Sequence, residues 1–149
     1  MPSEPRWLTP AEVIEINRIA VAETGEPHML VQPAMLDGAL GRPRNRYAYS
    51  RETDLGRLAA FMLVGISKNH AFQQGNKRTA LIAADVFLTI NGHEFVFADE
   101  ALADPVLDVT SGALDEMRFV AHFAAGVRKI GAGGAVPKVL AETVSRGSA

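Results

Sequence analysis

Apolar residues recur at helical spacing directly after a helix-start signal near the beginning of the chain. Thr9, Pro10 and Glu12 form a capping-box pattern with proline at the first helical position. The apolar residues that follow at intervals of three and four are Val13, Ile16, Ile19 and Ala20. This pattern predicts a first helix that ends near Gly25, because glycine suits helix C-termini.

Two later segments are apolar on nearly every side. One begins near Thr53 and runs through Leu55 to Ile66, and the other spans residues 79–90 and ends at Asn91-Gly92. A helix that is apolar nearly all round is buried among other helices. We therefore expect two central helices, joined by a polar segment that lies close to the core.

The region before the first central segment has a weaker pattern. Pro33 can open a short helix through Leu36 and Leu40. Residues 41–51 are basic, contain two tyrosines and show no helical period. For them we predict an exposed loop or a small hairpin.

The C-terminal third alternates between element types. Residues 93–97 predict a short strand, and residues 99–108 predict a helix broken at its start by proline. Thr110 or Ser111 can cap a last long helix that carries apolar residues from Leu114 to Val127. Residues 131–149 are expected to form a tail, with a flexible glycine-rich break at 131–134. For residues 135–149 we expect a helical turn or two, or a frayed end.

Composition narrows the class of protein. The chain has 149 residues, 48% of them hydrophobic, and a net charge of −2, which predicts one soluble domain over residues 1–149. The patterns described above make this domain mostly α, with at most a small β-hairpin. The absence of cysteine excludes disulfides, thiolate metal sites and a cysteine nucleophile. The slightly acidic balance argues against a large nucleic-acid-binding face. The chain shows neither a signal peptide nor an apolar run of membrane-spanning length, so we expect a cytoplasmic protein without a membrane partner.

The polar segment between the two central helices carries the candidate chemistry. It ends in Gly75, and a helix is predicted to begin near Asn76, where backbone N–H groups and the helix dipole favour an anion. Lys77 and Arg78 have the wrong sign for that dipole, which points to a bound phosphate. His70 is the nearby side chain that can move a proton near neutral pH. Taken singly, a histidine at a helix end is more often a cap, and Lys-Arg is usually a solvated face.

The order of these residues resembles a known signature. The run His70-Ala71-Phe72-Gln73-Gln74-Gly75-Asn76-Lys77-Arg78 is similar to the motif of the Fic/Doc family, and its continuation to Leu81 resembles the Doc (death-on-curing) branch. The resemblance covers about residues 8–128. It implies an all-α fold and transfer of part of ATP to a protein hydroxyl. In Doc toxins this is phosphorylation of elongation factor Tu, a translation factor, and a Phd-like antitoxin is the neutralising partner.

By position, the resemblance also implies residue roles. His70 would be the catalytic base, and Gly75, Asn76, Lys77 and Arg78 would hold the nucleotide phosphates. Residues 42–51 would correspond to the region that positions the target.

The sequence departs from the family pattern at two positions. Leu81 replaces an arginine that AMP-transferring members carry, which favours phosphate transfer over AMP transfer. Gln74 occupies the acidic position that the family ties to Mg²⁺, and a neutral amide is a poor ligand for that ion. Two alternatives therefore stay open: a Fic-type AMP transferase, and a catalytically impaired protein that binds a nucleotide or an antitoxin.

The remaining histidines and the tryptophan are interpreted as structural. His28, His93 and His122 show no metal-ligand spacing. Trp7 precedes the Thr9 cap, and we expect it to staple the first helix to the core.

Overall fold

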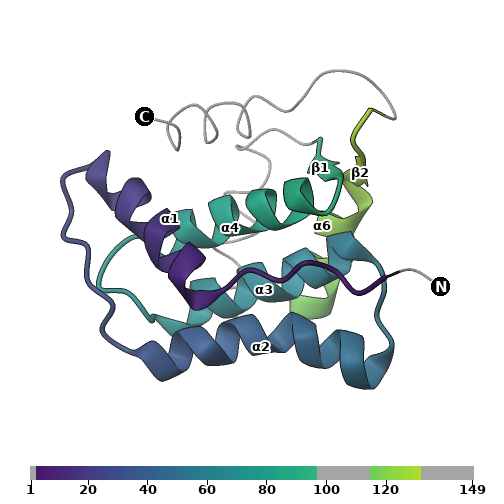
Figure 1. The fold of residues 1–149 in the computed structure, drawn as a ribbon, viewed down its shortest axis with the longest axis horizontal. Coiled ribbons are helices and arrows are strands. Elements are labelled where there is room, and N and C mark those ends of the chain that lie inside the picture. The colour runs from purple at the N-terminus through teal and green to yellow at the C-terminus, as the bar shows by residue number, and fades with distance from the viewer. Residues whose placement is uncertain (1–2, 97–114, 132–149) are drawn as a thin grey trace.

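The computed structural model describes residues 3–96 and 115–131, and these form five helices and two short strands (Figure 1). In chain order the elements are α1 (Pro10–Ala22), α2 (Pro33–Ser50), α3 (Leu55–Asn69), α4 (Asn76–Ile90), β1 (His93–Phe95), α6 (Glu116–Ala125) and β2 (Val127–Lys129). The two strands pair antiparallel, with Glu94 opposite Arg128. The predicted all-α class with one small sheet is confirmed.

The first helix forms as its capping box predicts. The Thr9 hydroxyl accepts a hydrogen bond from the Glu12 N–H, and the Glu12 carboxylate accepts one from the Thr9 N–H. The helix ends at Ala22, three residues before Gly25, which adopts a left-handed φ of 71°. Trp7 stacks on the Phe87 ring of α4 and meets the Tyr47 ring edge-on, so its predicted packing role is confirmed.

Helix α3 lies at the centre of the bundle and packs against α2, α4 and α6. Gly56 and every residue from Leu58 to Ser67 are buried, as the nearly uniform apolar pattern predicts. Two glycines let neighbouring helices approach closely: a Cβ at Gly56 would lie 2.9 Å from the Ala124 Cα, and one at Gly65 would lie 3.1 Å from the Ala39 Cα. The fully buried phenylalanines of the core are Phe61, Phe72, Phe87, Phe119 and Phe123.

The prediction of a loop or hairpin for residues 41–51 is wrong, because α2 continues through this region to Ser50. In this second half of α2, the stems of long polar side chains cover the core, so no helical spacing of apolar residues is visible in the sequence. The Arg46 guanidinium lies 4.2 Å from the centre of the Phe61 ring, and Arg42 pairs with Glu116 of α6. Pro43 is buried within the helix.

The last described helix is shorter than predicted. α6 begins at Glu116 and is capped by Asp115, whose carboxylate accepts from the Met117 N–H. It ends at Ala125, and Val127 lies in β2 instead of the helix, because this stretch pairs with β1. Several predictions fall outside the described residues: the candidate caps Thr110 and Ser111, Leu114, the helix at 99–108 and the tail after Gly131. Among the residues that are described, no helix is both long and apolar enough to span a membrane.

Candidate functional site

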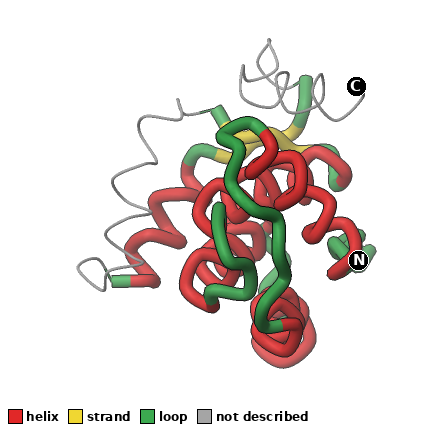
Figure 2. The backbone as a smooth tube through the Cα atoms, turned by 90° about the vertical axis from the view of Figure 1, so that its left-hand side faces the viewer, coloured by secondary structure: helices red, strands yellow, loops and turns green. Residues whose placement is uncertain are grey.

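The loop between α3 and α4 is held by main-chain pairing with the segment before α2. The Val31 N–H donates to the Ala71 carbonyl at 2.8 Å, and the Gln73 N–H donates to the Met29 carbonyl at 2.9 Å. Figure 2 shows the two connections side by side at this end of the bundle. Phe72 is 2% exposed, which confirms that it anchors the loop to the core.

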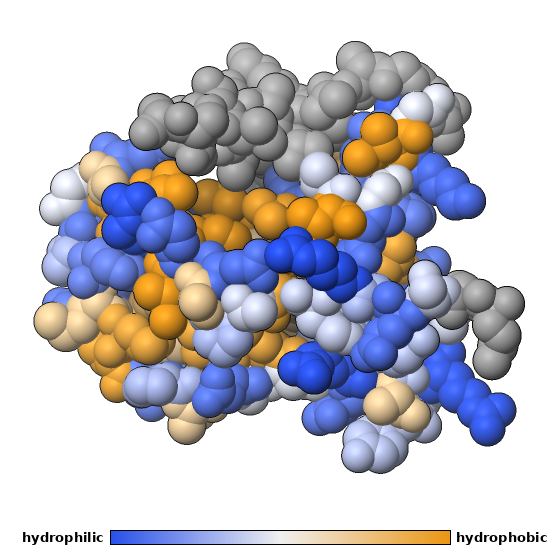
Figure 3. Space-filling model, viewed as in Figure 1, coloured by the Kyte–Doolittle hydropathy of each residue, from blue (hydrophilic) through white to orange (hydrophobic). Residues whose placement is uncertain are grey.

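Exposed apolar side chains flank this loop. Met29, Val31 and Met35 are each more than a third exposed. In Figure 1 the loop after α1 meets the start of α2 at the lower left. Figure 3, in the same view, shows apolar surface there. The loop that follows His70 is therefore bordered by surface that can contact another protein.

His70 ends α3 in a left-handed conformation, with φ 50° and ψ 44°. Its backbone carbonyl accepts a hydrogen bond from the Gln32 side chain at 3.0 Å, which fixes the loop start. The residue itself is exposed. Histidine tolerates this backbone region better than most residues, but glycine is the usual occupant. An exposed imidazole at a fixed position can accept a proton from a hydroxyl brought to it.

Gly75 opens α4 with φ 76° and ψ 20°, and no side chain caps this helix start. A left-handed residue followed by helical ones turns successive N–H groups toward one concave side, which is an anion-binding arrangement. The first turn of α4 contains no acidic residue. The predicted helix start at Asn76 is thus confirmed, and its backbone geometry suits a phosphate.

The Asn76 side chain is used to shape the loop. Its Oδ1 accepts from the Phe72 N–H at 3.1 Å, and its Nδ2 donates to the Phe72 carbonyl at 2.9 Å. With both side-chain groups bonded to the Phe72 backbone, the group that Asn76 offers to a ligand is its main-chain N–H. Lys77, the next residue, is exposed.

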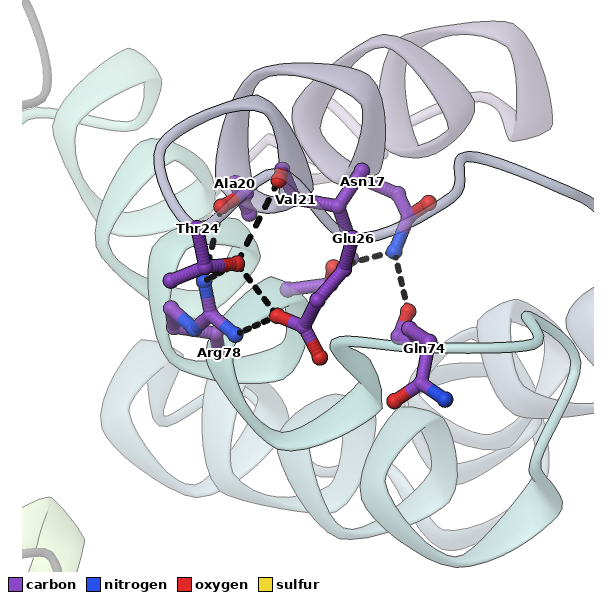
Figure 4. Close-up of polar contacts among 8 residues, drawn as sticks. Asn17, Ala20, Val21, Thr24, Glu26, Gln74 and Arg78 are labelled. Carbon is purple, nitrogen blue, oxygen red and sulfur yellow. Dashed lines mark hydrogen bonds and ion pairs between the residues drawn. The ribbon is translucent and has the colours of Figure 1, made fainter.

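Arg78 points back toward the end of α1 (Figure 4). Its Nη2 lies 2.7 Å from the Glu26 Oε1, and its Nη1 donates to the Ala20 carbonyl at 2.7 Å. The Thr24 hydroxyl also donates to Glu26. That hydrogen bond, with the Arg78 guanidinium beside it, lowers the pKa of Glu26 below its ordinary value. The predicted phosphate-binding arginine therefore already has an acidic partner within the chain.

The sequence interpretation missed Glu26. It is 52 positions from Arg78, so no local spacing connects the two residues. The only sequence signal is a carboxylate directly after the glycine that follows the first helix.

The residues present do not fit a dedicated Mg²⁺ site. The exposed residue at the acidic position of the motif is the neutral Gln74. Within residues 3–96 and 115–131, no group of three His, Cys, Asp or Glu side chains could hold a metal. The carboxylate that contacts the first turn of α4, Glu26, is engaged by Arg78 and Thr24. Mg²⁺ prefers charged oxygen ligands, and this loop supplies none.

The sequence interpretation also missed Asn17, which lies behind the loop. Asn17 is fully buried on α1 and hydrogen-bonds the Gln74 carbonyl, the Thr79 hydroxyl and the His28 ring. The His28 ring also lies over Phe72, with ring centres 6.5 Å apart, in line with its structural interpretation. An asparagine among the apolar residues of the first helix was the available signal.

A separate cavity of about 630 Å³ lies between the segment before α1 and helix α2. Its lining includes Trp7, Leu40 and Arg44, the last from the predicted target-positioning region, but none of the predicted catalytic or phosphate-binding residues. The site residues instead gather at the two ends of the loop, with His70 at the start and residues 74–78 at the end.

Comparisons with known proteins find similarity over a stretch that includes this loop. The sequence model of the family described as "Fic/DOC family" matches residues 7–88. The chain is 33% identical over 109 residues to "Protein kinase doc" of Escherichia phage P1, covering 73% of this chain and 86% of that protein. It is 44% identical over 59 residues to "Toxin Doc" of Mycolicibacterium smegmatis, covering 39% of this chain and 45% of that protein.

Proposed function

Because this chain belongs to the Fic/Doc family, we propose that it is a Doc-like toxin that transfers the γ-phosphate of ATP to a protein hydroxyl. The proposal rests on two features that lie at opposite ends of the loop between α3 and α4. An exposed histidine ends α3, and a glycine-opened helix start with no side-chain cap begins α4. The name of one relative, a protein kinase, supports phosphate transfer, and the name of the other, a toxin, supports the toxin assignment.

In the proposed reaction, His70 is the general base. Its neutral imidazole takes the proton of the target hydroxyl as the hydroxyl oxygen bonds to the γ-phosphorus. The bond between the γ-phosphorus and the bridging oxygen breaks, and ADP leaves with that electron pair. The products are ADP, the phosphorylated hydroxyl and a protonated His70.

The start of α4 holds the phosphates in this proposal. The N–H groups of Gly75 and Asn76 and the positive end of the helix dipole stabilise the developing charge. Lys77 is exposed and adds a mobile cation. Arg78 is paired with Glu26 in the free protein, so a phosphate that binds Arg78 competes with this ion pair.

No step of this proposal passes through Mg²⁺, because position 74 lacks the carboxylate that would hold the ion. This same observation favours a second candidate function, a protein that binds a nucleotide or an antitoxin and has lost catalysis. AMP transfer, the remaining alternative, is disfavoured by Leu81.

The proposed partners follow from the toxin assignment. The substrate is a translation factor similar to elongation factor Tu, and a Phd-like antitoxin neutralises the protein. A toxin that acts on translation is expected to work in the cytoplasm, and neither a membrane nor a nucleic acid is among the proposed partners.

Labelled ATP tests the three candidates in one experiment. The protein is incubated with elongation factor Tu and ATP labelled at either the γ- or the α-phosphate. Transfer of the γ-label alone to protein supports the kinase, and transfer of the α-label identifies an AMP transferase. ATP binding without either transfer identifies the impaired binding protein.

A further inference from the structure

One buried side chain connects three segments of the candidate site. Asn17 is 0% exposed, and all of its polar groups have partners. Its Nδ2 donates to the Gln74 carbonyl at 2.9 Å and to the Thr79 hydroxyl oxygen at 3.0 Å. Its Oδ1 lies 2.8 Å from the His28 Nδ1. Since Oδ1 can only accept, this contact requires the His28 Nδ1 to carry the proton.

The bond to the Gln74 carbonyl has a consequence for the next N–H group. A trans peptide is planar, so the carbonyl of one residue and the N–H of the following residue point in opposite directions. No peptide bond among the described residues is cis. Figure 4 shows the Asn17 amide bonded to the Gln74 carbonyl. Because the peptide is planar and trans, the Gly75 N–H must point away from α1.

The packing around Gly75 shows which side of the turn is open. A Cβ at Gly75 would lie 2.8 Å from the Val21 Cγ1 and 3.4 Å from the Asn17 Nδ2, so α1 closes the side behind the turn. A ligand must therefore approach from the opposite side, toward which the Gly75 N–H is directed. Gly75 needs its left-handed φ of 76° for this geometry.

We propose that Asn17 is the positioning residue of the phosphate site, because it fixes the Gln74–Gly75 peptide so that the Gly75 N–H faces the bound nucleotide. Asn17 itself does not touch the ligand. The inference rests on the proposed nucleotide-dependent function. Without the amide, the Gln74 carbonyl loses its buried donor, and the peptide is free to rotate its carbonyl toward the phosphates, where it repels them.

Two matched substitutions separate this role from general packing. Asn17→Leu replaces the amide by an apolar group of similar size and removes the bond to Gln74. Thr79→Val, also at a fully buried position, removes the hydroxyl from the same cluster but leaves the bond between Asn17 and Gln74. Both variants lose polar contacts in one buried place, so both are expected to melt at a lower temperature than the wild type.

The readouts are calorimetric ATP affinity and the backbone amide signals of a ¹⁵N-labelled protein. We expect Asn17→Leu to bind ATP about tenfold more weakly, which is the loss of one hydrogen bond to a charged group. The ATP affinity of Thr79→Val should stay within about twofold of that of the wild type, because the bond between Asn17 and Gln74 is kept. ATP should shift the Gly75 amide signal in the wild type and in Thr79→Val but not in Asn17→Leu.

Specific results overturn the inference. Equal ATP affinity of Asn17→Leu and the wild type would do so, as would equal losses in the two variants. If Asn17→Leu does not fold, the wild type decides: a Gly75 amide that ATP leaves unmoved while the Lys77 amide shifts rejects the role of Asn17. The proposed function fails separately, when the wild type transfers no label from ATP.

Discussion

The Nη2 of Arg78 lies 2.7 Å from the Oε1 of Glu26, so the arginine predicted to hold a phosphate is neutralised by the chain itself. Both side chains are about one-third exposed, and a surface ion pair of this kind is weak. A nucleotide phosphate, with more charge and more acceptor oxygens, can displace such a carboxylate. In the proposed function, Arg78 therefore exchanges Glu26 for a phosphate.

Glu26→Gln should strengthen ATP binding several-fold, because Arg78 is then free before the nucleotide arrives. Calorimetric titration with ATP measures the change. Glu15→Gln is the matched control, since it removes the same charge from the exposed pair with Arg18 on α1. Unchanged affinity in Glu26→Gln would assign Arg78 to the tertiary ion pair alone.

His70→Ala should abolish transfer of the γ-label and leave ATP affinity nearly unchanged, because the imidazole moves a proton and does not hold the phosphates. His70→Asn is the companion variant, since asparagine tolerates the left-handed backbone. Thermal melting reports the fold of both. If activity falls only in parallel with the melting temperature, the histidine is a structural cap.

Gln74→Glu should increase Mg²⁺-dependent ATP binding and transfer by about tenfold, since restoring a metal ligand is worth that much. The side chain is exposed and of nearly equal size, so packing is unaffected. The measurement is ATP affinity and label transfer at a series of Mg²⁺ concentrations. A wild type with the same activity and the same Mg²⁺ dependence as the variant would show that the carboxylate is dispensable.

Thr9→Ala should lower the free energy of unfolding by about 0.5–2 kcal/mol, the usual cost of losing an N-cap. Thr9→Ser keeps the hydroxyl and serves as the control. Chemical denaturation of both variants provides the comparison. A loss in Thr9→Ser as large as that in Thr9→Ala would mean that the methyl group, and not the cap, stabilises α1.

The same capping box predicts a pH dependence. The hydrogen bond from the Thr9 N–H, opposed by partial burial, lowers the pKa of Glu12 in the folded protein. A carboxyl with a lowered folded pKa contributes stability above its unfolded pKa and loses it as the pH falls through the folded value. Acid denaturation of Glu12→Gln should therefore show a smaller loss of stability than the wild type below the ordinary glutamate range.

Gly56→Ala should destabilise the protein by about 1–3 kcal/mol although alanine favours helices, because the added methyl group has no room. It would lie 2.9 Å from the Ala124 Cα, where helix α6 crosses α3. Gly41→Ala in α2 is the control, since a Cβ there has no neighbour within 4 Å. Denaturant unfolding should show loss in the first variant and a small gain in the second; equal effects would contradict the close approach.

The sequence predicted those elements whose signals are local. Thr9 and Glu12 predict the start of α1, and the apolar run after Leu55 predicts a buried helix. Each pattern is complete within one or two helical turns. The second half of α2 was missed because Arg46 and Tyr47 cover the core with side chains that count as polar. Val127 was assigned to a helix because its strand partner, Phe95, lies 32 positions away.

The candidate site was predictable to the same extent. The motif identifies the loop and the start of α4, and both lie where the sequence places them. The side-chain partners are tertiary: Glu26, which pairs with Arg78, lies in the loop after α1, and Asn17, which bonds the Gln74 carbonyl, lies in the middle of α1. Such contacts depend on how α1 packs on α4, which no spacing within the motif encodes.

At His70, the residue type needed for the proposed proton transfer differs from the one that would make the fold most stable. A left-handed conformation costs a residue with a side chain about 1–2 kcal/mol, and glycine escapes most of that cost. Stability alone would therefore favour glycine at the end of α3, and replacing the candidate base by glycine would raise the free energy of unfolding. A screen for thermostable variants of this chain should accordingly enrich for proteins that have lost the imidazole.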